Sequence, residues 1–252
     1  MEITTSQSTL EGESIETIIA KYGVDCLKGA DLSNTDLHEV NLCGIDLTGA
    51  DMHGATLTGA SLDCAILVNA SLINVNMRNA SMCSANLSSA NLTNVDMSWS
   101  DLTDADLTGA DLYYAVLTGA TLTRADMCGV DLCRATLRDA DMSDADMSNA
   151  NMQYARLCDA DMRDADMSNA DMSNADMHRA DMGHAHIADA IMSGTILRYA
   201  DMRHADLTCA DLTGADLTGA NLTGANLTGA NLTGANLRES RTVRADMTVV
   251  TR

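Results

Sequence analysis

Aromatic residues and proline are almost missing from this chain of 252 residues. It contains no Phe and no Pro, one Trp and five Tyr. Apolar residues still make up 46% of the chain, which is enough for a core of ordinary size. The composition is therefore biased, and it favours one elongated domain over two globular ones.

Basic residues are also scarce. The chain has 15 Lys and Arg against 36 Asp and Glu, a formal net charge of −21. A surface of this sign repels nucleic acid and attracts proteins that carry basic surfaces. We therefore expect no direct nucleic-acid binding.

Long apolar runs and metal-binding cysteine pairs are absent too. No stretch approaches 18 apolar residues, and no basic segment followed by an apolar one begins the chain. We therefore expect neither a membrane span nor a secretory signal, and place the protein in the cytoplasm. The eight cysteines show no Cys-X-X-Cys spacing, which indicates free thiols rather than disulfides or a zinc site.

What the chain does contain is a repeat. Residues 210–237 read Ala-Asp-Leu-Thr-Gly twice, then Ala-Asn-Leu-Thr-Gly three times, then Ala-Asn-Leu. The register continues back to Ala30 without insertion or deletion, so residues 30–239 form 42 pentapeptides. The central residue is Leu in 26 units, Met in 15 and Ile once, and the residue two before it is Ala in 34 units. The outward residue between them is Asp in 21 units and Asn in 9.

This spacing predicts short strands and turns. The central and the small apolar residue share one face of a strand, and the Asp or Asn between them faces solvent. The last residue of each unit is Gly in 13 units and Asn in 8, which suits the positive φ of a tight turn. Apolar residues at alternating spacings of two and three would form no stripe on a helix. The units should therefore stack into a solenoid with one continuous core.

These tandem Ala-Asp/Asn-Leu-X-X units resemble the pentapeptide-repeat family. The resemblance covers about five sixths of the chain. It implies an all-β fold, a right-handed quadrilateral parallel β-helix with four pentapeptides per coil and about ten and a half coils in residues 30–239.

The remaining segments are assigned as follows. Residues 1–11 should be flexible, and residues 12–29 should contain a short amphipathic helix that caps the first coil, with Ile15, Ile18, Ile19 and Tyr22 on its apolar stripe. Residues 240–252 are expected to be a C-terminal tail of weak pattern. The uncapped last coils favour a homodimer through the C-terminal end, and a monomer whose tail covers that edge is the alternative.

Acidic residues fall into columns if residues 20 apart stack. One face would carry Asp101, Asp141, Asp161, Asp181 and Asp201 in its middle column and Asp104, Asp144 and Asp164 in its last. The simplest explanation is solubility. The alternative is an acidic DNA mimic, because some proteins that this sequence resembles imitate DNA and bind DNA gyrase, inhibiting it or protecting it from quinolones. Three features of that group are missing here: Phe at the centres, a loop between coils and an apolar C-terminal helix.

A few aromatic and imidazole side chains could form sites. Trp99, Tyr113 and Tyr114 should project from neighbouring coils, and Tyr114, Arg134 and Tyr154 should share a column that allows cation–π contacts. Asp164, His184 and His204 share another column and are a weak candidate for metal binding, although chance alignment accounts for them better.

No nucleophile elbow, phosphate-binding loop or concave pocket is expected on such a rod. We therefore expect a non-catalytic protein-binding or scaffold module without a cofactor or a resident metal, which acts on a protein partner that the sequence does not identify.

Overall fold

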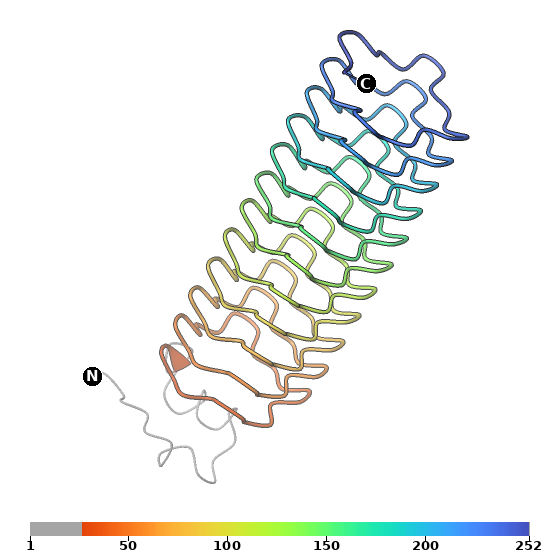
Figure 1. Cartoon of the computed structure of the whole chain (residues 1–252). Coiled ribbons are helices and arrows are strands. Elements are labelled where there is room, and N and C mark those ends of the chain that lie inside the picture. Colours follow the sequence, from red (N-terminus) through yellow and green to blue (C-terminus); the bar gives the residue numbers. More distant parts are fainter. Residues whose placement is uncertain (1–26, 252) are drawn as a thin grey trace.

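A computed structural model of the chain describes residues 27–251, which form one regular stack of coils (Figure 1). Parallel β-bridges join each outward residue to the residue 20 positions later, from Asp31↔Asp51 to Asn231↔Thr251. Each strand is reduced to its one bridged residue, and turns connect them. Four pentapeptides therefore complete one coil, and the predicted right-handed quadrilateral β-helix is confirmed. The helix expected within residues 12–29 lies almost wholly outside the described residues.

The rod has four long faces, which we name after the central residues of one coil. In chain order they are the Leu107, Leu112, Leu117 and Leu122 faces, and each contains the pentapeptides that lie multiples of 20 residues away. Every pentapeptide ends in a turn that carries the chain to the next face. The turns stack as well, and they form four corner columns along the rod (Figure 1).

Backbone hydrogen bonds account for the regularity of the coils. Residues 110–114 show the pattern: Ala110 N–H donates to Leu107 O (2.9 Å), Asp111 N–H to Ala90 O (3.0 Å), Leu112 N–H to Asp131 O (2.7 Å), Tyr113 N–H to the Asp111 carboxylate (2.9 Å) and Tyr114 N–H to Cys133 O (3.2 Å). All five donors of the unit are satisfied. The outward Asp or Asn is thus part of the backbone's hydrogen bonding as well as a solvated side chain.

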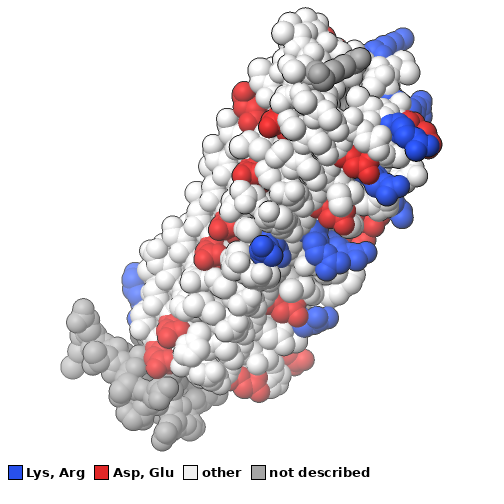
Figure 2. Space-filling model, in the orientation of Figure 1, with Lys and Arg blue, Asp and Glu red and all other residues white. Residues whose placement is uncertain are grey.

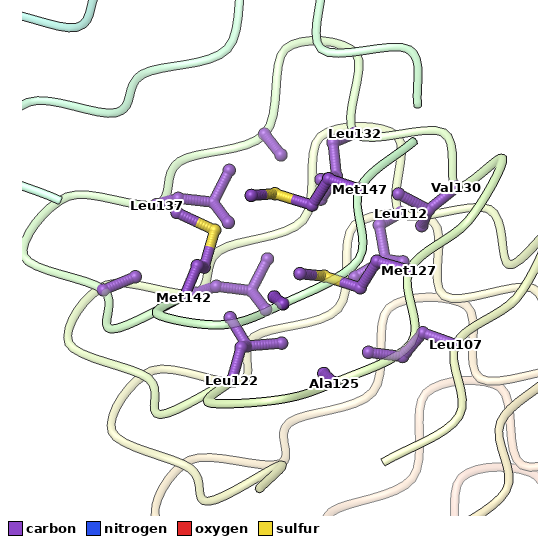
Figure 3. Packing of buried hydrophobic residues seen from close by; sticks show 14 of the residues in the cluster. Leu107, Leu112, Leu122, Ala125, Met127, Val130, Leu132, Leu137, Met142 and Met147 are labelled. Carbon is purple, nitrogen blue, oxygen red and sulfur yellow. The ribbon is translucent and has the colours of Figure 1, made fainter. Parts of the chain in front are cut away.

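The core is one continuous column of apolar side chains. Every central residue from Leu32 to Leu232 is at most 5% exposed. Met127, Met142 and Met147 interleave with Leu side chains of the neighbouring coils (Figure 3). Met is flexible enough to fill the space that a Leu would leave. The two polar residues at small positions, Ser100 and Thr195, each donate their hydroxyl to the carbonyl of the preceding centre at 2.6 Å.

The corners impose an unusual backbone conformation. The second residue after each centre has a positive φ in every unit from Gly29 to Val249, between 55° and 74°. Fourteen of these residues are Gly and 31 are not. The backbone geometry therefore does not depend on Gly or Asn, and corner residues of many types accept the strain, which costs about 1–2 kcal/mol for a non-glycine residue.

The coils continue beyond the boundary that the sequence suggested. Outward residues Arg241, Asp246 and Thr251 bridge to the coil below, so the predicted end at residue 239 is too early. The pairing persists because it uses backbone groups, whereas Thr242 at a central position breaks the apolar pattern. Val243 and Val249 are 58% and 79% exposed in this last coil. The homodimer through these coils stays a prediction.

The inward and outward positions predict opposite effects for two neighbouring residues. Met147 is fully buried, so Met147→Asp should cost several kcal/mol of unfolding free energy, because the carboxylate would have no partner in the core. Asp146 accepts a hydrogen bond from Ser148 N–H, which an Asn can also accept, so Asp146→Asn should be mild. Thermal melts of the two variants measure the difference. A larger loss for Asp146→Asn would contradict the assignment of the core.

Candidate protein-binding surface

Three tyrosines and an arginine form a cluster on the corner between the Leu112 and Leu117 faces. The rings of Tyr113 and Tyr114 meet edge to face, with centroids 4.4 Å apart. The guanidinium carbon of Arg134 lies 5.8 Å from the centroid of Tyr114 and 5.0 Å from that of Tyr154. The predicted column of Tyr114, Arg134 and Tyr154 is therefore present, with the arginine over both rings. We call Tyr113, Tyr114, Arg134 and Tyr154 the tyrosine–arginine cluster.

The corner explains why this cluster is exposed. Tyr114, Arg134 and Tyr154 all occupy the position of positive φ, with φ values of 58°, 62° and 58°. A side chain at this position leaves the corner outward, and its nearest column neighbours are 20 residues away on adjacent coils. Tyr114 and Tyr154 are 45% and 49% exposed. Each cation–π contact at such a site contributes about 0.5–1 kcal/mol.

Trp99 does not join this cluster. It lies on the following corner, between the Leu117 and Leu122 faces, and is 57% exposed. Its ring lies over Gly119, where a methyl group would come within 2.2 Å of it. Among residues 27–251 it makes no ring contact with the tyrosines. The aromatic residues that the sequence grouped together therefore occupy two corners, because five residues of separation means a quarter turn of the rod.

Another aromatic residue follows the same arrangement nearer the C-terminus. Tyr199 lies over Gly219 on the corner of Trp99, and its ring meets His178 at 5.8 Å. Glycine in a corner column thus leaves room for a large side chain from the coil below to lie along the rod. Trp99 and Tyr199 depend on this room.

The acidic columns of the Leu122 face are partly neutralised. Arg124 forms two hydrogen bonds with Asp104, at 2.7 and 2.8 Å, and these lower the pKa of that carboxyl. Arg163 does the same for Asp161 and also lies 3.9 Å from Asp181, while Arg203 pairs with Asp201. Asp141, Asp144 and Asp164 have no ion pair within the described part of the chain. Half of the predicted acidic set is therefore compensated.

The neighbouring Leu107 face has the longest uncompensated acidic ladder. Asp106, Asp126, Asp146 and Asp166 are bridged in succession. No Lys or Arg occurs in this face between residues 45 and 249, and none of the four forms an ion pair with another described residue. The polyanionic surface is thus on this face rather than on the Leu122 face.

The histidine column does not assemble a metal site. The rings of His184 and His204 stack with centroids 5.1 Å apart and an interplanar angle of 17°. Nitrogen lone pairs in two nearly parallel rings do not converge on one ion. Among residues 27–251, no three His, Cys, Asp or Glu side chains are placed to hold a metal.

The seven described cysteines are free thiols, and one differs from the others. Cys158 was expected at an exposed turn position, but it is 9% exposed on the Leu117 face. Burial raises its pKa to about 11, so it stays a protonated, weakly reactive thiol at neutral pH.

Sequence reasoning missed two arginines beside the tyrosine–arginine cluster. Arg138 and Arg156 lie on the Leu117 face, and Arg156 bridges to Thr136 of the coil that contains Arg138. The signal was available, because residues 134, 138 and 156 fall within one 20-residue coil and the start of the next. Figure 2 shows basic side chains interspersed with acidic ones along one long side of the visible face.

Comparison with known proteins agrees with this geometry. The family model described as pentapeptide repeats matches eight copies, over residues 26–63, 65–104, 100–139, 140–179, 175–214 and 205–248. The chain belongs to the pentapeptide-repeat family. No match was found among curated proteins.

Several solved structures resemble this pentapeptide-repeat protein. HetL of the cyanobacterium Nostoc sp. strain PCC 7120, a pentapeptide-repeat protein involved in the regulation of heterocyst differentiation, is 29% identical, with a TM-score of 0.56 over 94% of this chain and 98% of HetL. A pentapeptide-repeat protein of the Arabidopsis thaliana thylakoid lumen is 30% identical over 41% of this chain and 69% of its own, with a TM-score of 0.28. The plasmid-mediated fluoroquinolone resistance protein QnrB1 is 16% identical over 84% of this chain and 89% of its own, with a TM-score of 0.33.

The described residues contain no helix with the length and hydrophobicity that crossing a membrane requires.

The contact between Trp99 and Gly119 predicts a fluorescence change, since the chain has one tryptophan. Gly119→Ala should displace the ring and shift its emission. Gly129→Ala is the matched control, because Gly129 has the same φ of +65° and open space where the methyl would lie. An equal shift in both variants would mean that backbone strain, and not the ring contact, is responsible.

Proposed function

We propose that this pentapeptide-repeat protein is a non-catalytic module that binds another protein through the tyrosine–arginine cluster. The observation that carries the proposal is the arginine held over two exposed tyrosine rings on a rigid corner. Tyr and Arg are the residue types that most often dominate binding energy in protein interfaces. Because both rings hold the guanidinium, little side-chain entropy is lost when a partner covers it.

The rigidity of the rod supports the same conclusion. The backbone under the cluster is bonded to the coils on both sides, and the central residues Leu112, Leu132 and Met152 beneath it are at most 1% exposed. A binding surface on such a scaffold keeps its shape in the absence of the partner. The protein would act by holding its partner.

The test is capture of a partner from a lysate of the source organism. Tyr114→Ala combined with Tyr154→Ala should abolish capture of a protein that the unaltered chain retains. Tyr199→Ala is the control, since Tyr199 occupies the same kind of corner position and is 53% exposed outside the cluster. Capture that survives the double substitution, or is lost equally in the control, would contradict the proposal.

One observation favours a second candidate function, an acidic mimic of DNA. The ladder Asp106 to Asp166 on the Leu107 face carries four charges about 4.8 Å apart with no base beside them. Such a surface would compete with DNA for the basic groove of a DNA-handling enzyme such as DNA gyrase.

A supercoiling assay with DNA gyrase tests this candidate. The protein should alter supercoiling, and Asp126→Asn combined with Asp146→Asn should weaken the effect several-fold, with a steep dependence on salt. Asp171→Asn combined with Asp211→Asn changes the charge equally on the Leu112 face and should matter less. No effect of the unaltered protein, or equal effects of both pairs, would exclude the ladder as the binding surface.

A further inference from the structure

The arginines of this protein divide into paired and unpaired groups. Acidic residues outnumber basic ones by more than two to one, and most described arginines have a carboxylate within 4.0 Å. Among residues 27–251, five have none: Arg134, Arg138, Arg156, Arg241 and Arg244. Three of the five occur together, at the edge of the tyrosine–arginine cluster and on the Leu117 face beside it.

We infer that Arg134, Arg138 and Arg156, together with Tyr114 and Tyr154, form a docking site for an acidic segment of a partner protein. We call these five residues the arginine patch. The inference rests on the proposed protein-binding function and names the chemistry of the partner.

Local charge decides the sign of the surface here. Asp159 is held by Arg179 at 3.1 Å, and Asp176 accepts a hydrogen bond from His178 N–H. At physiological ionic strength charges are screened over about 8 Å, which is less than two coils of about 4.8 Å each. A partner at the patch therefore interacts chiefly with the three uncompensated guanidiniums, although the whole protein is strongly acidic.

The geometry suits carboxylates on an extended chain. Four residues separate Arg134 from Arg138 across the face, at most about 13 Å of extended backbone. Carboxylates three residues apart on a partner strand are separated by about 10 Å. Guanidinium groups also bind carboxylates in bidentate fashion, and the stacking of Arg134 over two rings fixes the plane of its donors.

Two features favour a protein segment over a nucleic acid. A long polyanion would extend beyond the patch onto the acidic ladder of Asp106 to Asp166 and the columns of the Leu122 face, and it would be repelled there. In addition, the faces of Tyr114 and Tyr154 are turned toward Arg134, so they are not free platforms for stacked bases. A short segment with a few carboxylates meets neither obstacle.

The experiment titrates the full chain against a short rhodamine-labelled peptide with Glu at every third position and Gly and Ser between, followed by fluorescence anisotropy. Arg134→Gln, Arg138→Gln and Arg156→Gln together should weaken binding about tenfold, since each exposed charge contact contributes modestly. The control replaces the paired arginines Arg78, Arg198 and Arg203 by Gln, which changes the net charge equally and should alter binding less than about twofold. Arg134→Lys, which keeps the charge but loses the flat stack, should lie between the two.

Two further probes sharpen the result, and thermal melts of each variant confirm that it is folded. The same peptide with Lys in place of Glu should not bind the patch. A single-stranded oligothymidylate should bind more weakly than the Glu peptide. Equal weakening by the two triple substitutions, no binding of the Glu peptide, or tighter binding of the oligothymidylate would each overturn the inference. If the Glu peptide fails while Tyr114→Ala and Tyr154→Ala still abolish capture of a partner, the proposed function stands and this inference falls.

Discussion

The structure depends on one constraint, the alignment of each residue with the residue 20 positions later. That alignment stacks a large and a small apolar side chain in every unit and pairs the backbone of each coil with the coils on both sides. A pentapeptide in isolation could not bury its central Leu or Met. Stacked in this register, the centres from Leu32 to Leu232 are almost completely buried. The burial of each coil therefore depends on its neighbours.

Most of the fold could be predicted because the repeat determines inward and outward positions directly. The alternation of Ala, Asp and Leu identified the core face, and the resemblance supplied the number of units per coil. The C-terminal boundary was misplaced because Thr242 and Ser240 break the apolar pattern, while the backbone pairing that continues to Thr251 leaves no signature in side chains. Likewise, only Gly and Asn announce the positive φ that all corner residues adopt.

The candidate surface was predictable only in part. The column of Tyr114, Arg134 and Tyr154 followed from the period of 20 alone, and its cation–π contacts were found where expected. The pairing of Arg163 with Asp161 and of Arg124 with Asp104 could not be predicted, because it depends on side-chain conformation within and between coils. That pairing determines which charges remain free. It places the uncompensated acids on the Leu107 face and the uncompensated arginines beside the tyrosines.

The unit of repetition and the unit of surface alignment differ in this protein. A gain or loss of five residues preserves every inward contact, since any pentapeptide can follow any other, but it turns all later residues by one face. Removal of one unit between Arg134 and Tyr154 would leave a well-packed rod in which the tyrosine lies on a different corner from the arginine. Only changes of 20 residues keep a column intact. Pentapeptide insertion and deletion can therefore create or separate a surface site in one step without any cost to the core.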